Sequence, residues 1–140
     1  MRSVAAVART TDGALVAVGS DADEREALAW TSADGSVWSV APREPSRLYA
    51  NGGKIRMTDV VAVPSGLVAI GNFVGLQFGT ATSWISADGR SWTRAPSYPA
   101  LGQGEMLGLT LAPAGLVAVG SYGAPDNYIP TIWLGPAPPG

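Results

Sequence analysis

A short apolar segment closed by glycine occurs three times in this chain. Gly13–Gly19 (GALVAVG) returns as Gly66–Gly71 (GLVAIG) and as Gly115–Gly120 (GLVAVG). The closing glycines lie 52 and 49 residues apart. A period of this length is typical of a repeat architecture, in which each repeat is one small structural unit stacked on the next.

A second block repeats out of phase with the first. Trp30–Trp38 (WTSADGSVW) returns as Trp84–Trp92 (WISADGRSW), and Trp133 stands where the first tryptophan of a third block would be. After Trp133 the sequence continues only as LGPAPPG. The 140 residues therefore contain two full repeats and a third without its last part.

Each repeat is predicted to form short antiparallel strands. The apolar runs are rich in β-branched residues, are bounded by Gly, Pro and Asp, and show no helical spacing of apolar residues. The strands expected in the first two repeats are Ser3–Arg9, Ala14–Ser20, Glu26–Ser32 and Ser36–Ala41, then Met57–Val63, Leu67–Phe73, Thr80–Ser86 and Arg90–Ala95. Those expected in the third are Met106–Ala112, Leu116–Tyr122 and Ile129–Gly135.

Four antiparallel strands in a repeat of this length match one blade of a β-propeller. The sequence therefore predicts an all-β fold, with residues 1–140 forming one incomplete ring of roughly three blades. We expect blade 1 at about 3–42, blade 2 at about 57–96 and blade 3, without its outer strand, at about 106–135. Residues 136–140 form a Pro-rich tail.

The Ala-Asp-Gly sequence inside the tryptophan block predicts a tight turn between the last two strands of a blade. A two-residue Asp-Gly loop would place Trp38 opposite Thr31. A three-residue loop with Gly35 in the left-handed region would pair Trp30 with Trp38. We favour the second register, because it explains the constant separation of the two tryptophans, and we expect Asp34 to accept hydrogen bonds from turn amides.

This hairpin resembles the Asp-box of BNR-type repeats, which occur in sialidase-like propellers. The usual pattern is S/T-x-D-x-G-x-x-W, and this sequence lacks the residue between Asp and Gly. The resemblance implies a structural turn away from any catalytic face, and a secreted or cell-surface bacterial protein. It assigns that structural role to Ser32, Asp34, Gly35, Trp38, Ser86, Asp88, Gly89 and Trp92.

Composition excludes several classes of function. Nine basic and eleven acidic residues give a net charge of −2, so a general binder of nucleic acid or of anionic membranes is not expected. Cysteine and histidine are both missing, which excludes disulfides, thiol nucleophiles, Cys/His zinc sites and histidine-based triads. We expect no cofactor, no metal and no catalytic residue.

Membrane and targeting segments are not expected either. The uncharged stretches Val60–Ala87 and Met106–Pro125 are interrupted by Pro and Gly, so they are interpreted as buried strands. Arg9 and Asp12 end the first apolar run too early for a signal peptide.

The longer connections, between the second and third strands and between blades, are expected at one end of the blades. Binding residues tend to lie on such loops. The candidate binding face consists of the charged and aromatic residues Asp21, Asp23, Arg43, Arg47, Tyr49, Arg56, Phe78, Tyr98, Tyr122 and Tyr128.

Two functions remain open at this point. The chain is a scaffold or binding module that contacts a glycan or a protein through these loops, or it is part of a sialidase-like glycoside hydrolase or a carbohydrate-binding lectin. The arginine-containing F-R-I-P motif of sialidases is missing, and Lys54–Met57 is the nearest string.

Roughly three blades are too few to close a ring, which needs four to eight. The partner is therefore expected to be other blades, from the rest of a longer chain or from a second copy in a homodimer. We favour the longer chain, because the third repeat stops without a replacement strand.

Overall fold

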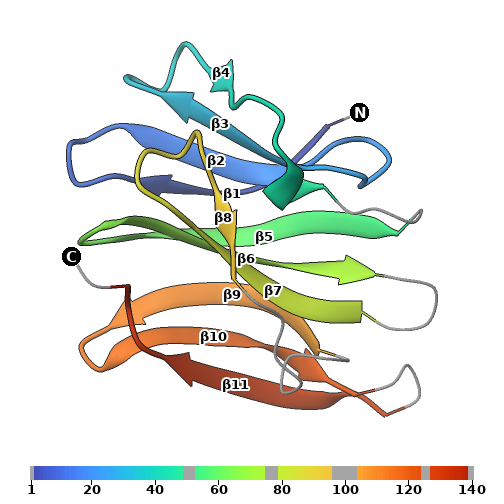
Figure 1. Cartoon of the computed structure of the whole chain (residues 1–140). Helices are drawn as coiled ribbons and strands as arrows, with labels where there is room; N and C mark the ends of the chain where they lie inside the picture. Colours follow the sequence, from blue (N-terminus) through green and yellow to red (C-terminus); the bar gives the residue numbers. More distant parts are fainter. Residues whose placement is uncertain (1, 49–52, 75–78, 96–103, 124–126, 139–140) are drawn as a thin grey trace.

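Three antiparallel sheets follow one another along the chain in the computed structural model (Figure 1). The structure describes residues 2–48, 53–74, 79–95, 104–123 and 127–138. The first sheet has the order β1 (Ser3–Arg9), β2 (Leu15–Ser20), β3 (Ala27–Ser32), β4 (Ser39–Val40). The second has the order β5 (Lys54–Val63), β6 (Gly66–Val74), β7 (Gly79–Ser86), β8 (Thr93–Arg94). The third consists of β9 (Gly104–Ala112), β10 (Gly115–Tyr122) and β11 (Ile129–Gly135).

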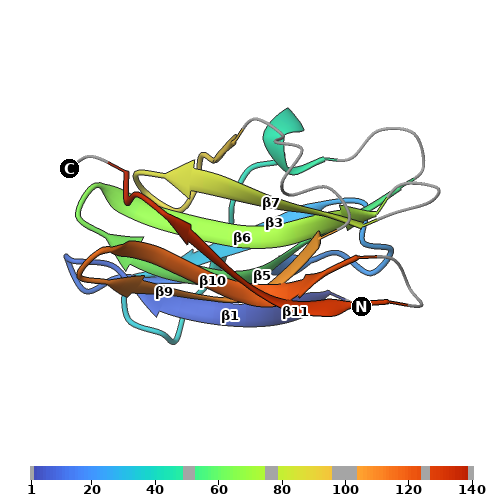
Figure 2. The ribbon, with the colours of Figure 1, turned by 90° about the horizontal axis from the view of Figure 1, so that it is seen from below.

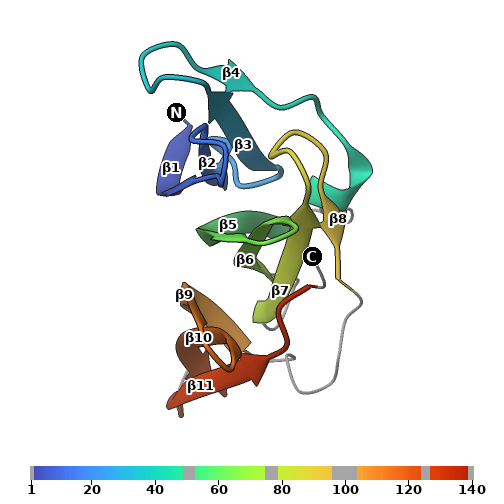
Figure 3. The ribbon, with the colours of Figure 1, turned by 90° about the vertical axis from the view of Figure 1, so that its left-hand side faces the viewer.

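These sheets resemble propeller blades, and the all-β prediction is confirmed. Figure 3 shows the three sheets one beside the next, with β1, β5 and β9 on the left, β4 at the top and β8 on the right. A single turn of 3₁₀ helix, η1 (Pro45–Arg47), lies between the first two sheets in sequence. No helix in the described ranges is long and apolar enough to cross a membrane.

The predicted fourth strands, Ser36–Ala41 and Arg90–Ala95, are too long. The ladders contain only β4 and β8, two residues each. The first residues of both predicted strands belong instead to the turn, where their amides bond to an aspartate rather than to a neighbouring strand.

A β-bulge recurs at one repeat position in the first strand of every sheet. The register shifts between Val4 and Ala6, between Met57 and Asp59, and between Met106 and Gly108. The closing glycines of the repeated segment pair with the residue at the start of each bulge. A Cβ added to Gly19, Gly71 or Gly120 would lie 1.8, 1.9 or 1.8 Å from the carbonyl oxygens of Ser3, Arg56 and Glu105.

The repeated closing glycine is therefore explained by close backbone approach. No other amino acid fits beside a carbonyl oxygen at that distance, because real Cβ atoms essentially never come within 3.0 Å of another heavy atom.

The core lies between successive sheets. Val16 and Val18 of β2 and Met57, Leu67 and Trp84 of the second sheet form one buried cluster. Alternate residues of β6 point to the other side, where Ile70 joins Met106 and Ala118 of the third sheet. The second sheet is thus buried on both faces, as a blade inside a propeller is. Viewed from below, Figure 2 shows the third sheet with β10 and β11 in front.

Candidate functional site

The two Ala-Asp-Gly turns have the same hydrogen bonds. In the second sheet the Ser86 hydroxyl accepts from the Gly89 amide at 2.8 Å, and Asp88 Oδ1 accepts from the amides of Arg90 and Ser91 at 2.8 and 3.0 Å. Trp92 Nε1 donates to the Gly89 carbonyl at 2.9 Å. In the first sheet Ser32, Asp34, Gly35 and Trp38 make the corresponding bonds. Each aspartate organises its own turn.

The strand register predicted for this hairpin is wrong. Trp30 pairs with Val40 rather than with Trp38, and Thr31 pairs with Ser39. The loop is longer than three residues because the tryptophan folds back to bond the glycine carbonyl instead of joining the ladder. The glycine conformation agrees with the prediction, since φ is +86° at Gly35 and +80° at Gly89, in the left-handed region.

These bonds lower the pKa of both aspartates below the ordinary value of 3.8. For Asp88 the backbone amides of Ser91 and then Arg90 are the largest causes. For Asp34 the Ser36 amide is the largest. A hydrogen bond donated to a carboxylate favours its charged form, so the turns are tightest when the aspartates are ionised.

Asp88→Asn is expected to lower the free energy of unfolding by about 1 kcal/mol at neutral pH, the scale of a charge-assisted hydrogen bond reduced by solvent exposure. Because the folded pKa is depressed, the contribution of Asp88 is complete above pH 3.8 and is lost as the pH falls through the lower folded value. Urea unfolding of the wild type and the variant between pH 2 and 7 measures this. Asp23→Asn is the control, since the exposed Asp23 side chain bonds to none of the described residues. A difference between wild type and Asp88→Asn that does not shrink in acid would contradict the assignment.

The equivalent tryptophans Trp38 and Trp92 have different environments. Trp92 is 3% exposed, because the turn at Gly89 packs on Val16 and Thr31 of the first sheet. Trp38 is 38% exposed, because no described sheet lies beside its turn. The same local structure is therefore buried at one position of the stack and open at the other.

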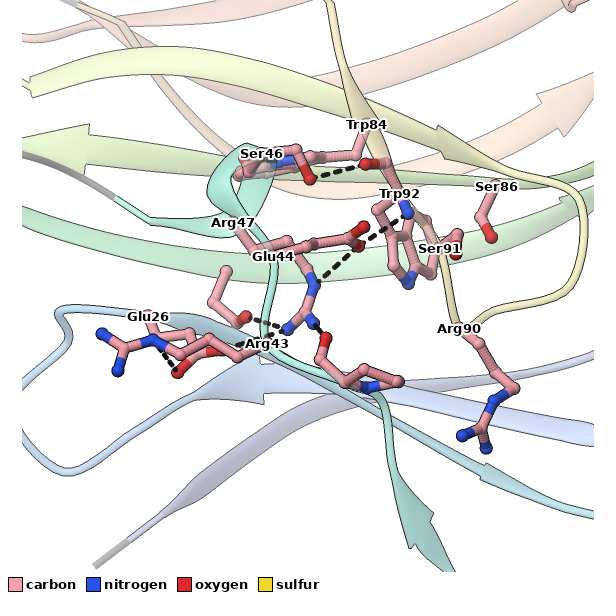
Figure 4. A network of polar contacts seen from close by, with 12 residues as sticks. Glu26, Arg43, Glu44, Ser46, Arg47, Trp84, Ser86, Arg90, Ser91 and Trp92 are labelled. Carbon is pink, nitrogen blue, oxygen red and sulfur yellow. Dashed lines mark hydrogen bonds and ion pairs between the residues drawn. The ribbon is translucent and has the colours of Figure 1, made fainter.

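A network of polar contacts joins the first sheet to the second (Figure 4). Arg47, fully buried on η1, donates from Nη1 to the Ala27 carbonyl at 2.7 Å, from Nη2 to the Pro42 carbonyl and from Nε to Glu44 at 3.2 Å. Glu44 also accepts from the Trp92 amide at 2.7 Å. Arg47 and Glu44 thus link the connection after β4 to the outer part of the second sheet.

Ser46 completes this link. Its hydroxyl donates to the Trp92 carbonyl at 2.5 Å, and its own carbonyl accepts from Trp84 Nε1 at 2.8 Å. Figure 4 shows Ser46 next to Trp84, with its hydroxyl directed at the Trp92 main chain. Sequence reasoning missed Glu44 and Ser46. The only available signal was their position in a connection that must cross from one blade to the next.

The candidate binding residues divide into structural and exposed ones. Asp21 accepts from the amides of Arg25 and Glu26 at 2.7 and 3.1 Å, which closes the loop after β2. Arg47 is buried and is not available to a ligand. Asp23 is exposed, and so is Arg43, whose side chain is 73% exposed and lies 3.7 Å from Glu26.

The remaining exposed candidates lie at the same end of the second and third sheets. Arg56 forms a half-exposed ion pair with Glu105 at 2.7 Å. Tyr122, at the end of β10, is 37% exposed, and Tyr128, just before β11, is 56% exposed. Tyr49, Phe78 and Tyr98 lie outside the described residues.

Hollows between the sheets include one beside Arg56 and a larger one that none of the described candidate binding residues lines. One of about 290 Å³ lies between β1 and β5 and is lined by Ser3, Glu24 and Arg56 among others. A larger, mainly apolar one of about 480 Å³ lies between the second and third sheets and reaches Trp133. Within the described ranges no three Asp or Glu side chains come together as a metal site would require.

Comparison with known proteins identifies a similar fold and gives no information on a reaction. No family model and no curated protein matches the sequence. Among solved structures the chain is similar to a GH32 β-fructofuranosidase of Bombyx mori, determined as a mutant in complex with sucrose, with a TM-score of 0.53 and 15% sequence identity. The match covers 90% of this chain and 32% of that one, so the chain spans about a third of the enzyme's length. The three sheets thus resemble part of a GH32 propeller.

Proposed function

We propose that the chain is a non-catalytic segment of a β-propeller with Asp-box turns, which acts as a scaffold or binding module through the loop end of its sheets. The observation that carries this proposal is that the exposed tyrosines Tyr122 and Tyr128 and the half-exposed Arg56–Glu105 ion pair lie at the same end of the second and third sheets. Tyr122 pairs with Gly104, the residue before Glu105 in β9, so Tyr122 and the ion pair share this end of the third sheet while the Tyr122 and Glu105 side chains point to opposite faces. Exposed rings and charged groups at one end of a sheet suit contact with a sugar or a peptide.

The charged groups elsewhere support a structural reading. Asp34 and Asp88 hold turns, Asp21 closes a loop, and Arg47 with Glu44 joins two sheets. The aspartates hold local turns, whereas Arg47 satisfies the buried Ala27 carbonyl and Glu44 joins the connection after β4 to the second sheet.

The alternative is part of a sialidase-like glycoside hydrolase or of a carbohydrate-binding lectin. The likeness to a GH32 propeller and the resemblance to the Asp-box favour it at the level of fold only. A lectin would use the same tyrosines without turnover, whereas a hydrolase would need a carboxylate pair that faces the substrate.

A glycan array combined with a fluorogenic sialoside assay tests these functions. We expect glycan or peptide binding that Tyr122→Ala and Tyr128→Ala weaken, and no release of fluorophore. Val37→Ala, at the opposite end of the first sheet and 73% exposed, is the matched control and should bind as the wild type does. Turnover that a carboxylate substitution abolishes would overturn the non-catalytic proposal.

We further propose that the open faces of the sheets meet other propeller blades, supplied by a longer chain or by a second copy. Apolar surfaces of this kind are normally interfaces in folded proteins.

A further inference from the structure

Two apolar faces lie at opposite ends of the stack of sheets. On the outer side of the first sheet, Val4, Val7 and Val40 are 62%, 59% and 43% exposed, and Trp38 in the turn before β4 is 38% exposed. In Figure 1 this sheet lies at the top and the third sheet at the bottom. A chain with such a face at each end can associate head to tail with a copy of itself.

The second sheet shows what kind of surface the outer face of the first sheet can pack against. Met57, Val60 and Trp92 occupy the repeat positions of Val4, Val7 and Trp38, and they are 1%, 5% and 3% exposed. They are buried because the second sheet packs on the first. The equivalent face of the first sheet is not covered by any other sheet within the described residues.

The third sheet offers the complementary surface. Its outward residues Val119, Ile132 and Leu134 are 45%, 68% and 80% exposed. A hollow of about 250 Å³ lies on it, lined by Val117 and Leu134 with neighbouring residues of β10 and β11.

In the repeat, this hollow is at the position where the first sheet contacts the turn of the second sheet. Val117 pairs with Leu134 as Val16 pairs with Thr31 in the first sheet. Val16 and Thr31 are the residues that hold the Gly89 turn, where a Cβ on Gly89 would lie 2.6 Å from Val16 and 3.2 Å from Thr31. The hollow is thus where the turn of a following sheet would be seated.

From these equivalences we propose that the first sheet of one copy packs on the outer face of the third sheet of a second copy. The Gly35–Trp38 turn then occupies the hollow lined by Val117 and Leu134. This rests on the proposal above that the open faces meet other blades, and it commits to a second copy because the chain itself carries both complementary faces. Two copies supply six sheets, within the range that closes a propeller ring.

Light scattering on the purified 140-residue chain measures the assembly. We expect the mass of two chains. Leu134→Arg should raise the dissociation constant of the dimer about 100-fold, because it places an unpaired charge in an apolar interface. Ile85→Arg is the matched control: Ile85 occupies the same repeat position on the second sheet, is 47% exposed, and has no turn of the third sheet over it among the described residues. Circular dichroism checks that both variants are folded.

A monomer, a filament, or a dimer that both substitutions affect equally would overturn the proposal. A monomeric mass would instead favour the view that further blades of a longer chain cover the open faces. The glycan and sialoside assays depend on Tyr122 and Tyr128 at another end of the sheets, so failure of one proposal is distinguishable from failure of the other.

Cysteine cross-linking tests the contact itself, since the chain has no cysteine of its own. Ser36→Cys protein mixed with Leu134→Cys protein should form a mixed disulfide under mild oxidation. Ser36→Cys mixed with Ile85→Cys should not exceed the background of each single variant. Equal yields from the two mixtures would contradict the proposed contact between the Gly35–Trp38 turn and the hollow lined by Val117 and Leu134.

Discussion

Gly71→Ala is expected to destabilise the chain by about 4 kcal/mol or more, a large part of the stability of a small domain. The added Cβ would lie 1.9 Å from the Arg56 carbonyl oxygen and 2.8 Å from Met57 Cα. Both obstacles are backbone, so no side chain can turn aside, and the β-bulge between Met57 and Asp59 would have to open. Urea unfolding followed by tryptophan fluorescence and circular dichroism measures the loss.

Gly79→Ala is the matched control for this substitution. Gly79 begins β7 in the same sheet, and the atoms nearest to its added Cβ are 3.9 Å away, which is ordinary contact. We expect a change within about 0.5 kcal/mol. Equal effects at Gly71 and Gly79 would show that loss of glycine, rather than the close carbonyl, causes the damage.

Arg47→Ala is expected to cost about 3–5 kcal/mol, the usual effect of removing one partner from a buried charged network. The carbonyls of Ala27 and Pro42 would lose their donor, and Glu44 would lose its guanidinium while it still accepts from the Trp92 amide. The first and second sheets should then unfold at lower urea concentration. Arg47→Lys should recover only part of the loss, since an ammonium cannot reproduce the planar set of donors.

Arg43→Ala provides the comparison for Arg47. Arg43 and Arg47 each lie 3.7 Å from Glu26, but the Arg43 side chain is 73% exposed, so it brings the same charge to the same carboxylate without burial. Exposed pairs of this kind contribute about 0–1 kcal/mol. If Arg43→Ala and Arg47→Ala destabilise the chain equally, general charge balance rather than the buried network holds the sheets together.

Much of the fold could be predicted because its signals are local. The first three strands of each sheet start and end within a few residues of the predicted bounds, and β11 matches them at both ends. Alternation of residues, glycine and proline at turns, and the left-handed glycines depend on chain neighbours only. The recurrence of the closing glycine was visible too, although its cause, a bulge in the adjacent strand, was not.

The candidate site was less predictable because burial depends on the neighbouring sheet. Arg47 and Arg43 look alike in sequence, yet one is buried and the other exposed, since only Arg47 on η1 turns back onto the Ala27 and Pro42 carbonyls. Of the exposed aromatics, Tyr122 and Tyr128 remained candidates once their surroundings were known.

The sequence by itself determined the repeat, the all-β class and the turn chemistry, because each arises from hydrogen bonds and steric limits within a few residues of chain. The hairpin register also follows from a local bond, from the tryptophan to the glycine carbonyl, although the sequence pattern did not reveal it. Only the tertiary structure decided the different burial of Trp38 and Trp92. Their local bonds are the same, and Trp92 is buried because a sheet lies beside it. Burial is a property of the assembled stack, since water is excluded by neighbours that the local sequence does not specify.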